Sequence, residues 1–152
     1  MKVYSLNTTQ FVPVSMEKAW DFFSSPENLE KITPSYMRFK ILTNVKDTPV
    51  YEGMRIEYKV SPILGIPLPW VTLISEVQSP YKFKDIQLKG PYKLWEHTHS
   101  FKKVDGGVEM TDTLRYALPL GILGRLAHFI FVKRQVEEIF HYRKGVLDKL
   151  FK

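Results

Sequence analysis

The chain has 152 residues, a formal net charge of +6 and no cysteine, which excludes disulfides and thiolate metal sites. This length predicts one domain over residues 1–152, and a polar N-terminus without a long apolar run predicts a soluble, cytoplasmic protein. The positive charges are spread along the chain rather than gathered in a dense basic block, so no nucleic-acid partner is expected.

The N-terminal part of the chain predicts one strand followed by two short helices. Residues 2–11 mix apolar side chains with Thr and Asn and predict the strand. Ser15 is a good N-cap for a helix whose apolar residues begin at Met16 and keep helical spacing. Ser25 and Pro26 predict the start of a second helix, with Ser25 as its cap, and this helix ends by Thr33.

The middle of the chain predicts six strands. Residues 51–61 alternate most clearly, because every second side chain from Met54 to Val60 is apolar and those between are charged. The other strands are expected at 37–44, 66–78, 82–88, 93–103 and 108–118. The links between them are short and rich in Gly, Pro and Asp, which favours an antiparallel meander.

The C-terminal segment, residues 122–150, predicts one long helix. Phe129, Val132, Val136 and Phe140 keep a helical period. Gly145 lies inside it, at a cost of about 1 kcal/mol relative to Ala, which suggests that a neighbouring element approaches closely there. A curved sheet must cover its apolar face, and only this helix is large enough to do so. The predicted fold class is α+β: a seven-stranded curved antiparallel sheet around a long C-terminal helix, with two short helices after the first strand.

One predicted strand carries two histidines on an apolar face. Trp95, His97, His99 and Phe101 alternate, so their side chains share one side of the sheet. An inward His-x-His motif needs partners for its ring nitrogens. The preceding strand offers Phe83, Asp85 and Gln87 on one face, and the register places Asp85 opposite His97 or His99.

The last predicted strand adds a second inward carboxylate. Asp112 falls on the same face as Met110, Leu114 and Tyr116. A buried carboxylate needs a partner, which Arg134 or Arg143 of the long helix, or a histidine, could provide. His128 and His141 also lie on this helix, where we expect surface or rim positions.

Three interpretations of Asp85, Gln87, His97, His99 and Asp112 are open. They could form a structural hydrogen-bond network, or polar anchors at the floor of an apolar ligand cavity. Alternatively they could perform chemistry, as a metal site of the His-x-His and carboxylate type or as a His-Asp acid-base pair. No nucleophile motif, phosphate loop or zinc-finger spacing is present in the sequence.

Two connecting segments are unusually apolar. Residues 61–70 and 118–123 contain mostly Pro, Leu, Ile and Gly, although connections normally face water. They either pack against each other or form an apolar rim that admits a lipid-like ligand or contacts a membrane. Lys59, Arg125 and Lys133 flank them and would favour an anionic surface.

Several motifs carry a resemblance to a known family. They are Pro26-Glu27-Asn28-Leu29, Gly65-Ile66-Pro67 to Trp70, residues 83–87, residues 90–101, Thr111-Asp112, residues 116–121 and Tyr142-Arg143. The chain resembles the START-like, or SRPBCC, superfamily of helix-grip proteins, and within it bacterial polyketide cyclase/dehydrase-like members. The resemblance implies an apolar cavity between sheet and long helix. Members bind lipids, sterols, quinones or polyketides, and a minority catalyse cyclisation or dehydration.

The sequence therefore predicts the binding of a hydrophobic small molecule (a lipid, an isoprenoid or a polyketide-like compound) and transient contact with an anionic membrane. The alternatives are a cyclase or dehydratase that uses a His-Asp pair, and a membrane-apposed lipid or quinone carrier. No cofactor, metal or catalytic residue is assigned, and an enzymatic role is not the favoured one. The expected ligand-binding residues are Tyr58, Trp70, Asp85, Gln87, Trp95, His97, His99, Phe101, Asp112 and Tyr116.

Overall fold

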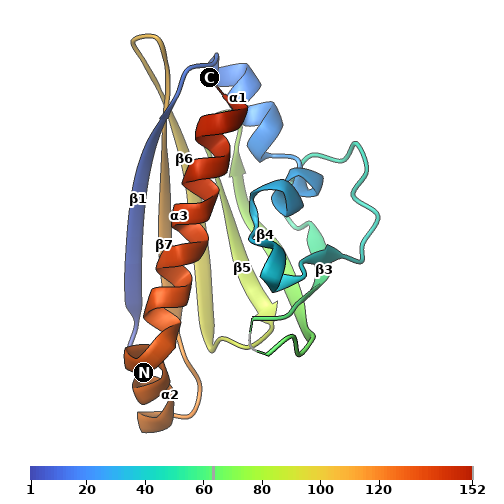
Figure 1. The fold of residues 1–152 in the computed structure, drawn as a ribbon. Coiled ribbons are helices and arrows are strands. Elements are labelled where there is room, and N and C mark those ends of the chain that lie inside the picture. Colours follow the sequence, from blue (N-terminus) through green and yellow to red (C-terminus); the bar gives the residue numbers. More distant parts are fainter. Residues whose placement is uncertain (63, 152) are drawn as a thin grey trace.

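A computed structural model describes residues 1–62 and 64–151. Its seven strands form one antiparallel sheet in the order β1-β7-β6-β5-β4-β3-β2, and this confirms the predicted sheet (Figure 1). The strands are β1 (Tyr4–Val12), β2 (Lys40–Ile41), β3 (Arg55–Val60), β4 (Leu68–Gln78), β5 (Lys82–Lys89), β6 (Leu94–Val104) and β7 (Gly107–Ala117). Consecutive strands from β2 to β7 are neighbours, whereas β1 pairs with β7 and so forms an edge of the sheet.

Two helical segments follow β1. The helix α1 (Met16–Phe23) begins as predicted, because the Ser15 hydroxyl accepts a hydrogen bond from the Lys18 amide at 3.1 Å. The next segment, η1 (Pro26–Ile32), is a 3₁₀ helix whose first residue is the predicted Pro26. Ser25 does not cap it as expected; its hydroxyl instead donates to the Asp21 carbonyl, at 2.8 Å, at the end of α1.

The strand expected at residues 37–44 is the main error in the predicted elements. Only Lys40–Ile41 pairs, as β2. Met37 belongs to a short 3₁₀ turn, η2 (Ser35–Met37), which ends at Arg38 in the left-handed region with φ of 47°. The left-handed conformation differs from the extended backbone of a strand, so the strand cannot begin before Arg38. The turn buries Met37 toward the interior, so tertiary packing decided this segment.

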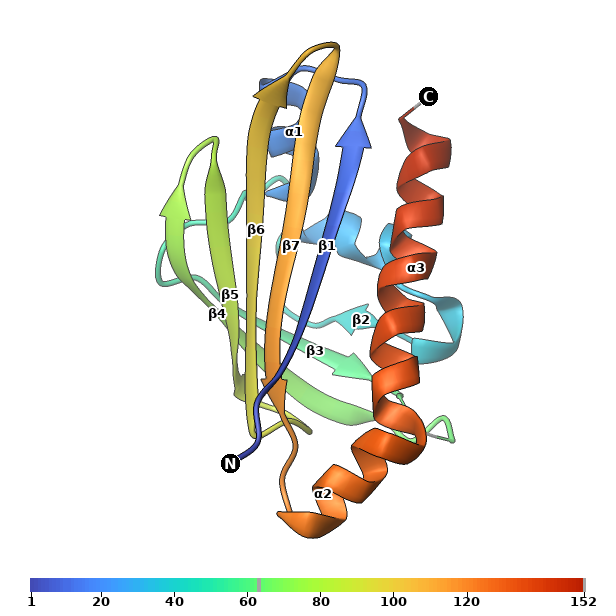
Figure 2. The same ribbon diagram turned by 90° about the vertical axis from the view of Figure 1, so that its left-hand side faces the viewer.

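The C-terminal helical region comprises α2 (Ile122–Ala127), the π-helical segment η3 (His128–Val132) and α3 (Lys133–Leu150). The backbone stays helical throughout, which agrees with the predicted range, but α2 runs at an angle to α3 (Figure 2). The helix α3 lies along the concave side of the sheet and buries Val136, Phe140, Arg143 and Leu147. Among the residues that the structure describes, none comes within 4 Å of the place that a Cβ at Gly145 would take, so the expected close approach is not found there.

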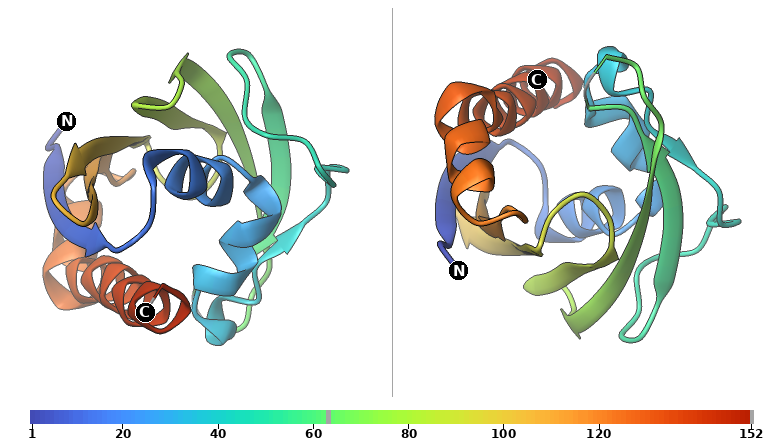
Figure 3. Two further views of the ribbon diagram at one scale, coloured as in Figure 1. Left: turned by 90° about the horizontal axis from the view of Figure 1, so that it is seen from above. Right: turned by 90° about the horizontal axis from the view of Figure 1, so that it is seen from below.

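The curved sheet, α1, η1 and α3 surround a common interior (Figure 3). Apolar side chains form clusters around this interior. Ala19, Phe83, Phe101 and Leu147 belong to one cluster, and β3 and β4 contribute a second cluster around Ile56 and Ile74. Among the described residues, no helix combines the length and the apolar character needed to cross a bilayer.

Candidate functional site

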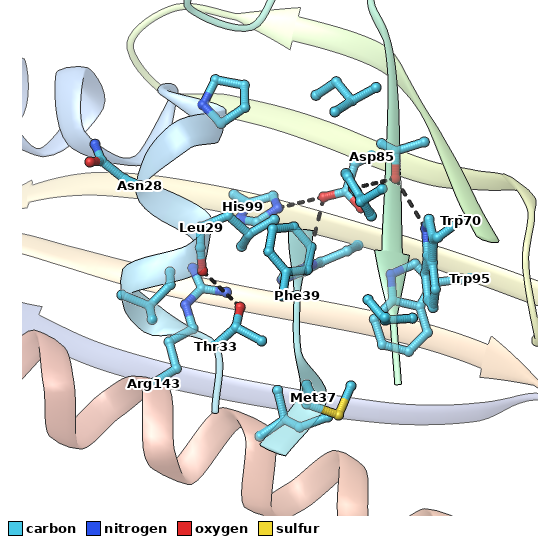
Figure 4. Close-up of a pocket in the computed structure, with 18 of the residues that line it drawn as sticks. Asn28, Leu29, Thr33, Met37, Phe39, Trp70, Asp85, Trp95, His99 and Arg143 are labelled. Atoms are coloured by element: carbon cyan, nitrogen blue, oxygen red, sulfur yellow. Dashed lines mark hydrogen bonds and ion pairs between the residues drawn. The ribbon is translucent and has the colours of Figure 1, made fainter. Parts of the chain in front are cut away.

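A cavity of about 190 Å³ lies between the sheet, η1 and α3. Its walls are mainly apolar and aromatic. Strands β3 and β4 contribute one side with Ile56, Tyr58, Trp70 and Ile74, and Leu29 of η1 faces it from another (Figure 4). Part of the wall is polar, because Asp85, His97, His99 and Arg143 also line the cavity. This combination of apolar walls and a few converging polar groups is typical of small-molecule sites.

Strand register brings the polar groups together. Asp85 of β5 lies directly opposite His97 of β6, and His99 lies directly opposite Asp112 of β7. The first of these pairings is one of the two that the sequence predicted, since Asp85 was expected opposite His97 or His99. Since alternate residues of a strand share a face, all four side chains point to the concave side.

The hydrogen bonds of this polar cluster run diagonally across the strands. His99 Nε2 lies 2.7 Å from Asp85 Oδ2, and His97 Nε2 lies 2.8 Å from Asp112 Oδ1. Arg143 reaches from α3 and places its Nη2 3.3 Å from the same Asp112 oxygen. Asp112 therefore pairs with Arg143 and a histidine, two of the predicted partners, whereas Arg134 is exposed.

Burial and charge act in opposite directions on the acids of the cluster. Burial raises the pKa of Asp112, but the Arg143 guanidinium and the hydrogen bond from His97 outweigh it and hold this pKa well below its usual range. Burial also raises the pKa of Asp85, and the bond to His99 and the charge of His97 lower it more. Both acids are therefore carboxylates at neutral pH.

His99 has the opposite balance. Burial and the neighbouring His97 lower its pKa to about 4, although Asp85 and Asp112 favour its charged form. His99 is therefore a neutral imidazole at neutral pH. Since its Nε2 contacts the Asp85 carboxylate, this nitrogen carries the ring proton and donates to Asp85.

A hydroxyl network stabilises the wall opposite η1. The Tyr58 hydroxyl and the Thr72 hydroxyl lie 2.5 Å apart, and the Trp70 indole N–H donates to the same Thr72 oxygen at 3.1 Å. Burial, together with the nearby Asp85 charge, raises the pKa of Tyr58 above its usual range. Tyr58 therefore stays protonated, and the two aromatic rings are held in place at the cavity wall.

Six of the ten predicted ligand-binding residues line this cavity: Tyr58, Trp70, Asp85, Trp95, His97 and His99. The other four do not. Gln87 bonds to the backbone of Tyr92, Phe101 packs against Trp20, and Tyr116 bonds to His128. Asp112 lies behind the histidines and lines a second hollow of about 290 Å³ between β1 and α3.

Sequence reasoning missed the walls that come from outside the strands. Leu29 of η1, Phe39 after η2 and Phe140 of α3 all line the cavity. The regular period of α3 marks Phe140 as inward, but no local signal predicts that η1 folds over the sheet. His128 was expected at the surface or rim and is instead buried, because Tyr4 stacks on its ring and Tyr116 bonds to its Nε2. His141 is exposed as expected.

The two apolar connections do not bury their side chains against each other. Leu64 and Ile66 are exposed in the first, and Leu120 is exposed in the second; Ile63 lies outside the described residues. The exposed apolar surface continues along α2 and η3. We call this surface the α2 apolar face; its residues are Leu120, Ile122, Leu123, Leu126, Phe129 and Ile130.

No family model and no curated protein matches the sequence. Solved structures do. A protein from Chromobacterium violaceum has a TM-score of 0.73 at 10% identity, covering 97% of this chain and 97% of that one. A protein from Thermus thermophilus has a TM-score of 0.65 at 16% identity, covering 98% and 100%. Ara h 8.0201 has a TM-score of 0.61 at 12% identity, covering 97% and 99%.

The chain has the helix-grip fold. The likeness to these structures extends over nearly the whole chain, and the sheet gripping a long C-terminal helix is the arrangement predicted from the sequence. At such low identity the likeness describes the fold and says nothing of the ligand. The chemistry of the site itself carries the information on function.

Proposed function

We propose that the protein binds a small hydrophobic molecule that carries a polar head. The observation that supports this most is the cavity itself, whose aromatic and aliphatic walls converge on Asp85, His97, His99 and Arg143. Apolar walls favour burial of a hydrophobic body. The Asp85 carboxylate, the two imidazoles and the Arg143 guanidinium at the wall offer hydrogen-bond partners to a hydroxyl, carbonyl or amine at one end of the ligand.

The volume limits the part of the ligand that is enclosed. A cavity of about 190 Å³ is smaller than the roughly 300 Å³ from which drug-sized pockets begin. A cavity of about 150 Å³ is known to hold benzene. The enclosed part is therefore about the size of one substituted ring or a short branched chain. A lipid, isoprenoid or polyketide-like ligand would place its head end inside and extend the rest outward.

Native mass spectrometry of protein purified from its own host tests this proposal. We expect a fraction of the chain to carry one hydrophobic molecule, which solvent extraction then identifies. Two of the three tryptophans, Trp70 and Trp95, line the cavity, so adding the extracted molecule back should change the intrinsic fluorescence. Preparations that carry no ligand, combined with no fluorescence response to hydrophobic ring compounds, would contradict the proposal.

A matched pair of substitutions locates the binding. Ile139 of α3 lines the cavity, whereas Ile130 of η3 is exposed. Ile139→Phe adds a ring inside the cavity and should reduce ligand uptake at least about tenfold, a loss of about 1.4 kcal/mol of binding free energy. Ile130→Phe adds the same ring at the surface and should leave uptake unchanged. Equal uptake by both variants would place the ligand elsewhere.

A membrane-apposed carrier is the second candidate, and the α2 apolar face favours it. Phe129 is 86% exposed and Ile122 is 77% exposed, with Arg125 and Lys133 beside them. A helical apolar face flanked by basic residues suits the interface of an anionic bilayer. We propose that this face rests on lipid while the cavity exchanges its ligand.

Vesicle flotation tests the carrier. Wild-type protein should float with vesicles that contain phosphatidylserine, and less so at high salt, because salt screens the attraction to the surface. Phe129→Ser combined with Ile122→Ser should abolish flotation, while Tyr51→Ser, which removes an exposed aromatic elsewhere, should not. Lack of flotation at low salt would contradict the carrier proposal. Light scattering that shows a dimer with the α2 apolar face buried between its two copies would also contradict it.

A catalytic role is the remaining candidate from the sequence. His99 lines the cavity as a neutral imidazole with Asp85 at 2.7 Å, which is the arrangement a general acid-base pair requires. Cyclisation of a diketone probe that is lost in His99→Gln, with binding of the probe retained, would support it. Binding of such probes without any turnover would contradict the catalytic role and agree with the binding function alone.

A further inference from the structure

We propose that Asp85, His97 and His99 form a binding site for one divalent transition-metal ion at the wall of the cavity. One ligand atom from each residue lies within 4.8 Å of the others. The site goes beyond the proposed binding function. Its occupation needs no organic ligand, and the two can therefore be tested separately.

The spacing of the donor atoms is close to that of a metal site. Asp85 Oδ2 lies 2.7 Å from His99 Nε2 and 3.7 Å from His97 Nδ1. A tetrahedral zinc ion with ligands at about 2.0–2.1 Å holds them about 3.3 Å apart. The two separations from Asp85 differ from this spacing by less than about 1 Å. The separation between the histidine ligand atoms is within 4.8 Å, and side-chain rotation would bring them closer.

The other nitrogen of each imidazole faces a second carboxylate. His97 Nε2 lies 2.8 Å from Asp112 Oδ1, and His99 Nδ1 lies 3.4 Å from the same oxygen. Histidines that bind metals commonly donate their second N–H to an outer carboxylate, which holds the ring in the tautomer that binds the ion. Asp112 occupies this outer position for both histidines, and Arg143 holds it there at 3.3 Å.

An unpartnered buried atom also points to an ion. His99 is 6% exposed, and its Nδ1 has no hydrogen-bond partner among the described residues. Without an ion, Nε2 carries the ring proton and donates a hydrogen bond to the Asp85 carboxylate. The unprotonated Nδ1 then presents its lone pair to the Asp112 carboxylate. An ion on Nε2 moves the proton to Nδ1, which then donates to Asp112. The ion thus turns an unfavourable contact into a hydrogen bond.

The donor set indicates the class of ion and leaves room for a ligand. Two imidazoles and one carboxylate favour Zn²⁺, Fe²⁺ or Co²⁺, whereas Mg²⁺ and Ca²⁺ prefer oxygen ligands. All three residues line the cavity, so the remaining coordination positions open toward it. Water or a polar group of a bound molecule would occupy them.

Titration of chelator-treated wild-type protein with Zn²⁺ and Co²⁺ tests the site. We expect one ion per chain with a Kd of about 1 µM or tighter, and visible Co²⁺ bands typical of low coordination number. Calorimetry gives the affinity and stoichiometry. A wild-type protein that binds neither ion with a Kd below about 100 µM would overturn the proposal.

Substitutions locate the ion. His99→Gln should weaken Zn²⁺ binding by about 100-fold or more, and Asp112→Asn, outside the coordination shell, by about 10–100-fold. His128→Gln is the matched control, since His128 is also buried but bonds to Tyr116. His141→Gln controls for an exposed histidine. Wild-type affinity in His99→Gln, or loss of binding in either control, would overturn the assignment.

A third measurement covers the case in which His99→Gln does not fold. Bound Co²⁺ broadens NMR signals near it, so in wild-type protein the amides of β5 and β6 should broaden first. Broadening centred elsewhere would overturn the site. Uptake of the organic ligand is measured separately with a chelator present, so that failure of the metal site and failure of the binding function give different results.

Discussion

At the scale of single residues, the polar cluster depends on its balance of charge. The cluster holds a buried carboxylate, Asp112, and a partly buried one, Asp85, but one buried guanidinium, Arg143, which pairs with Asp112. Removing one member of a buried ion pair leaves the charge of the other buried without a counter-charge, which destabilises the fold. Arg143 also lies over the rings of Phe23 and Phe140, at 5.8 and 5.9 Å, and so connects the cluster to the apolar core.

Replacing Arg143 tests this balance. Arg143→Met keeps much of the length of the side chain and leaves Asp112 short of a counter-charge, so the free energy of unfolding should fall by about 3–5 kcal/mol. The double variant with Asp112→Asn should lose less than the sum of the single losses, because the two residues interact directly. Urea unfolding of all four proteins gives the cycle; strictly additive losses would contradict the pairing.

A second residue-scale prediction concerns pH. Burial, followed by the charges of Lys133 and Lys2, lowers the pKa of His128 in the fold, whereas Glu137 opposes this. The histidine of the unfolded chain, with a pKa of about 6.5, therefore binds a proton at a higher pH than the same histidine in the fold. The stability due to neutral His128 is present above that pH and is lost as the pH falls. The difference in unfolding free energy between wild type and His128→Gln should shrink as the pH is lowered from above to below that value; a constant difference would contradict this.

At the scale of elements, local irregularities shape the site. Strand β4 shifts register against β5 between Val71 and Thr72 and again between Ile74 and Glu76. Such bulges bend a strand and increase its twist. Thr72 and Ile74 lie between the two shifts and both line the cavity. The curvature that opens space between sheet and helix therefore coincides with irregularities in this strand.

The helix α3 offers a simple stability prediction. Gly145 lies inside it, and a Cβ at this position meets no atom of the described part of the chain within 4 Å. Gly145→Ala should therefore raise the free energy of unfolding by about 0.5–1 kcal/mol, because Ala loses less entropy in a helix. Gly53→Ala is the matched control: it also has open space, but its φ of +91° strains an L-residue. Thermal unfolding should show a gain for the first and a loss for the second.

At the scale of the whole molecule, space between sheet and helix is unevenly filled. Val136 of α3 is 1% exposed and packs against Leu114 and Tyr116, whereas Ile139 faces the cavity. A phenyl ring added at these two positions should therefore lower the free energy of unfolding by different amounts. Val136→Phe should destabilise by about 1–3 kcal/mol through overpacking, and Ile139→Phe by less. Urea unfolding measures both, and equal losses would mean that the cavity does not accept side-chain atoms.

Much of the fold could be predicted from the sequence because it rests on local periodicity. The alternation of Met54, Ile56, Tyr58 and Val60 is the burial pattern that the structure shows. Parity along β5 and β6 placed Asp85 opposite His97 or His99, and the structure has it opposite His97. Both inferences need only the two-residue repeat of a strand and short links, and these are properties of the chain itself.

Parts of the candidate site depended on packing between distant segments. No local pattern indicates that η1 closes over the sheet, that Met37 leaves its expected strand, or that His128 is enclosed by Tyr4. Nor could parity decide the actual hydrogen bonds, since Asp85 bonds diagonally to His99 rather than to His97 opposite it. Side-chain length and rotamer decide that choice.

The sequence by itself determined the helix-grip arrangement, the inward face of β6 and the carboxylates near its histidines, because periodicity dictates which side chains share a face. Only the tertiary structure decided that Asp85, His97 and His99 line a cavity of about 190 Å³ while Asp112 lies behind them. The physical reason is that a cavity is what packing leaves unfilled. Its size and walls depend on how α3 and η1 meet the curved sheet, and these contacts join residues far apart in the chain.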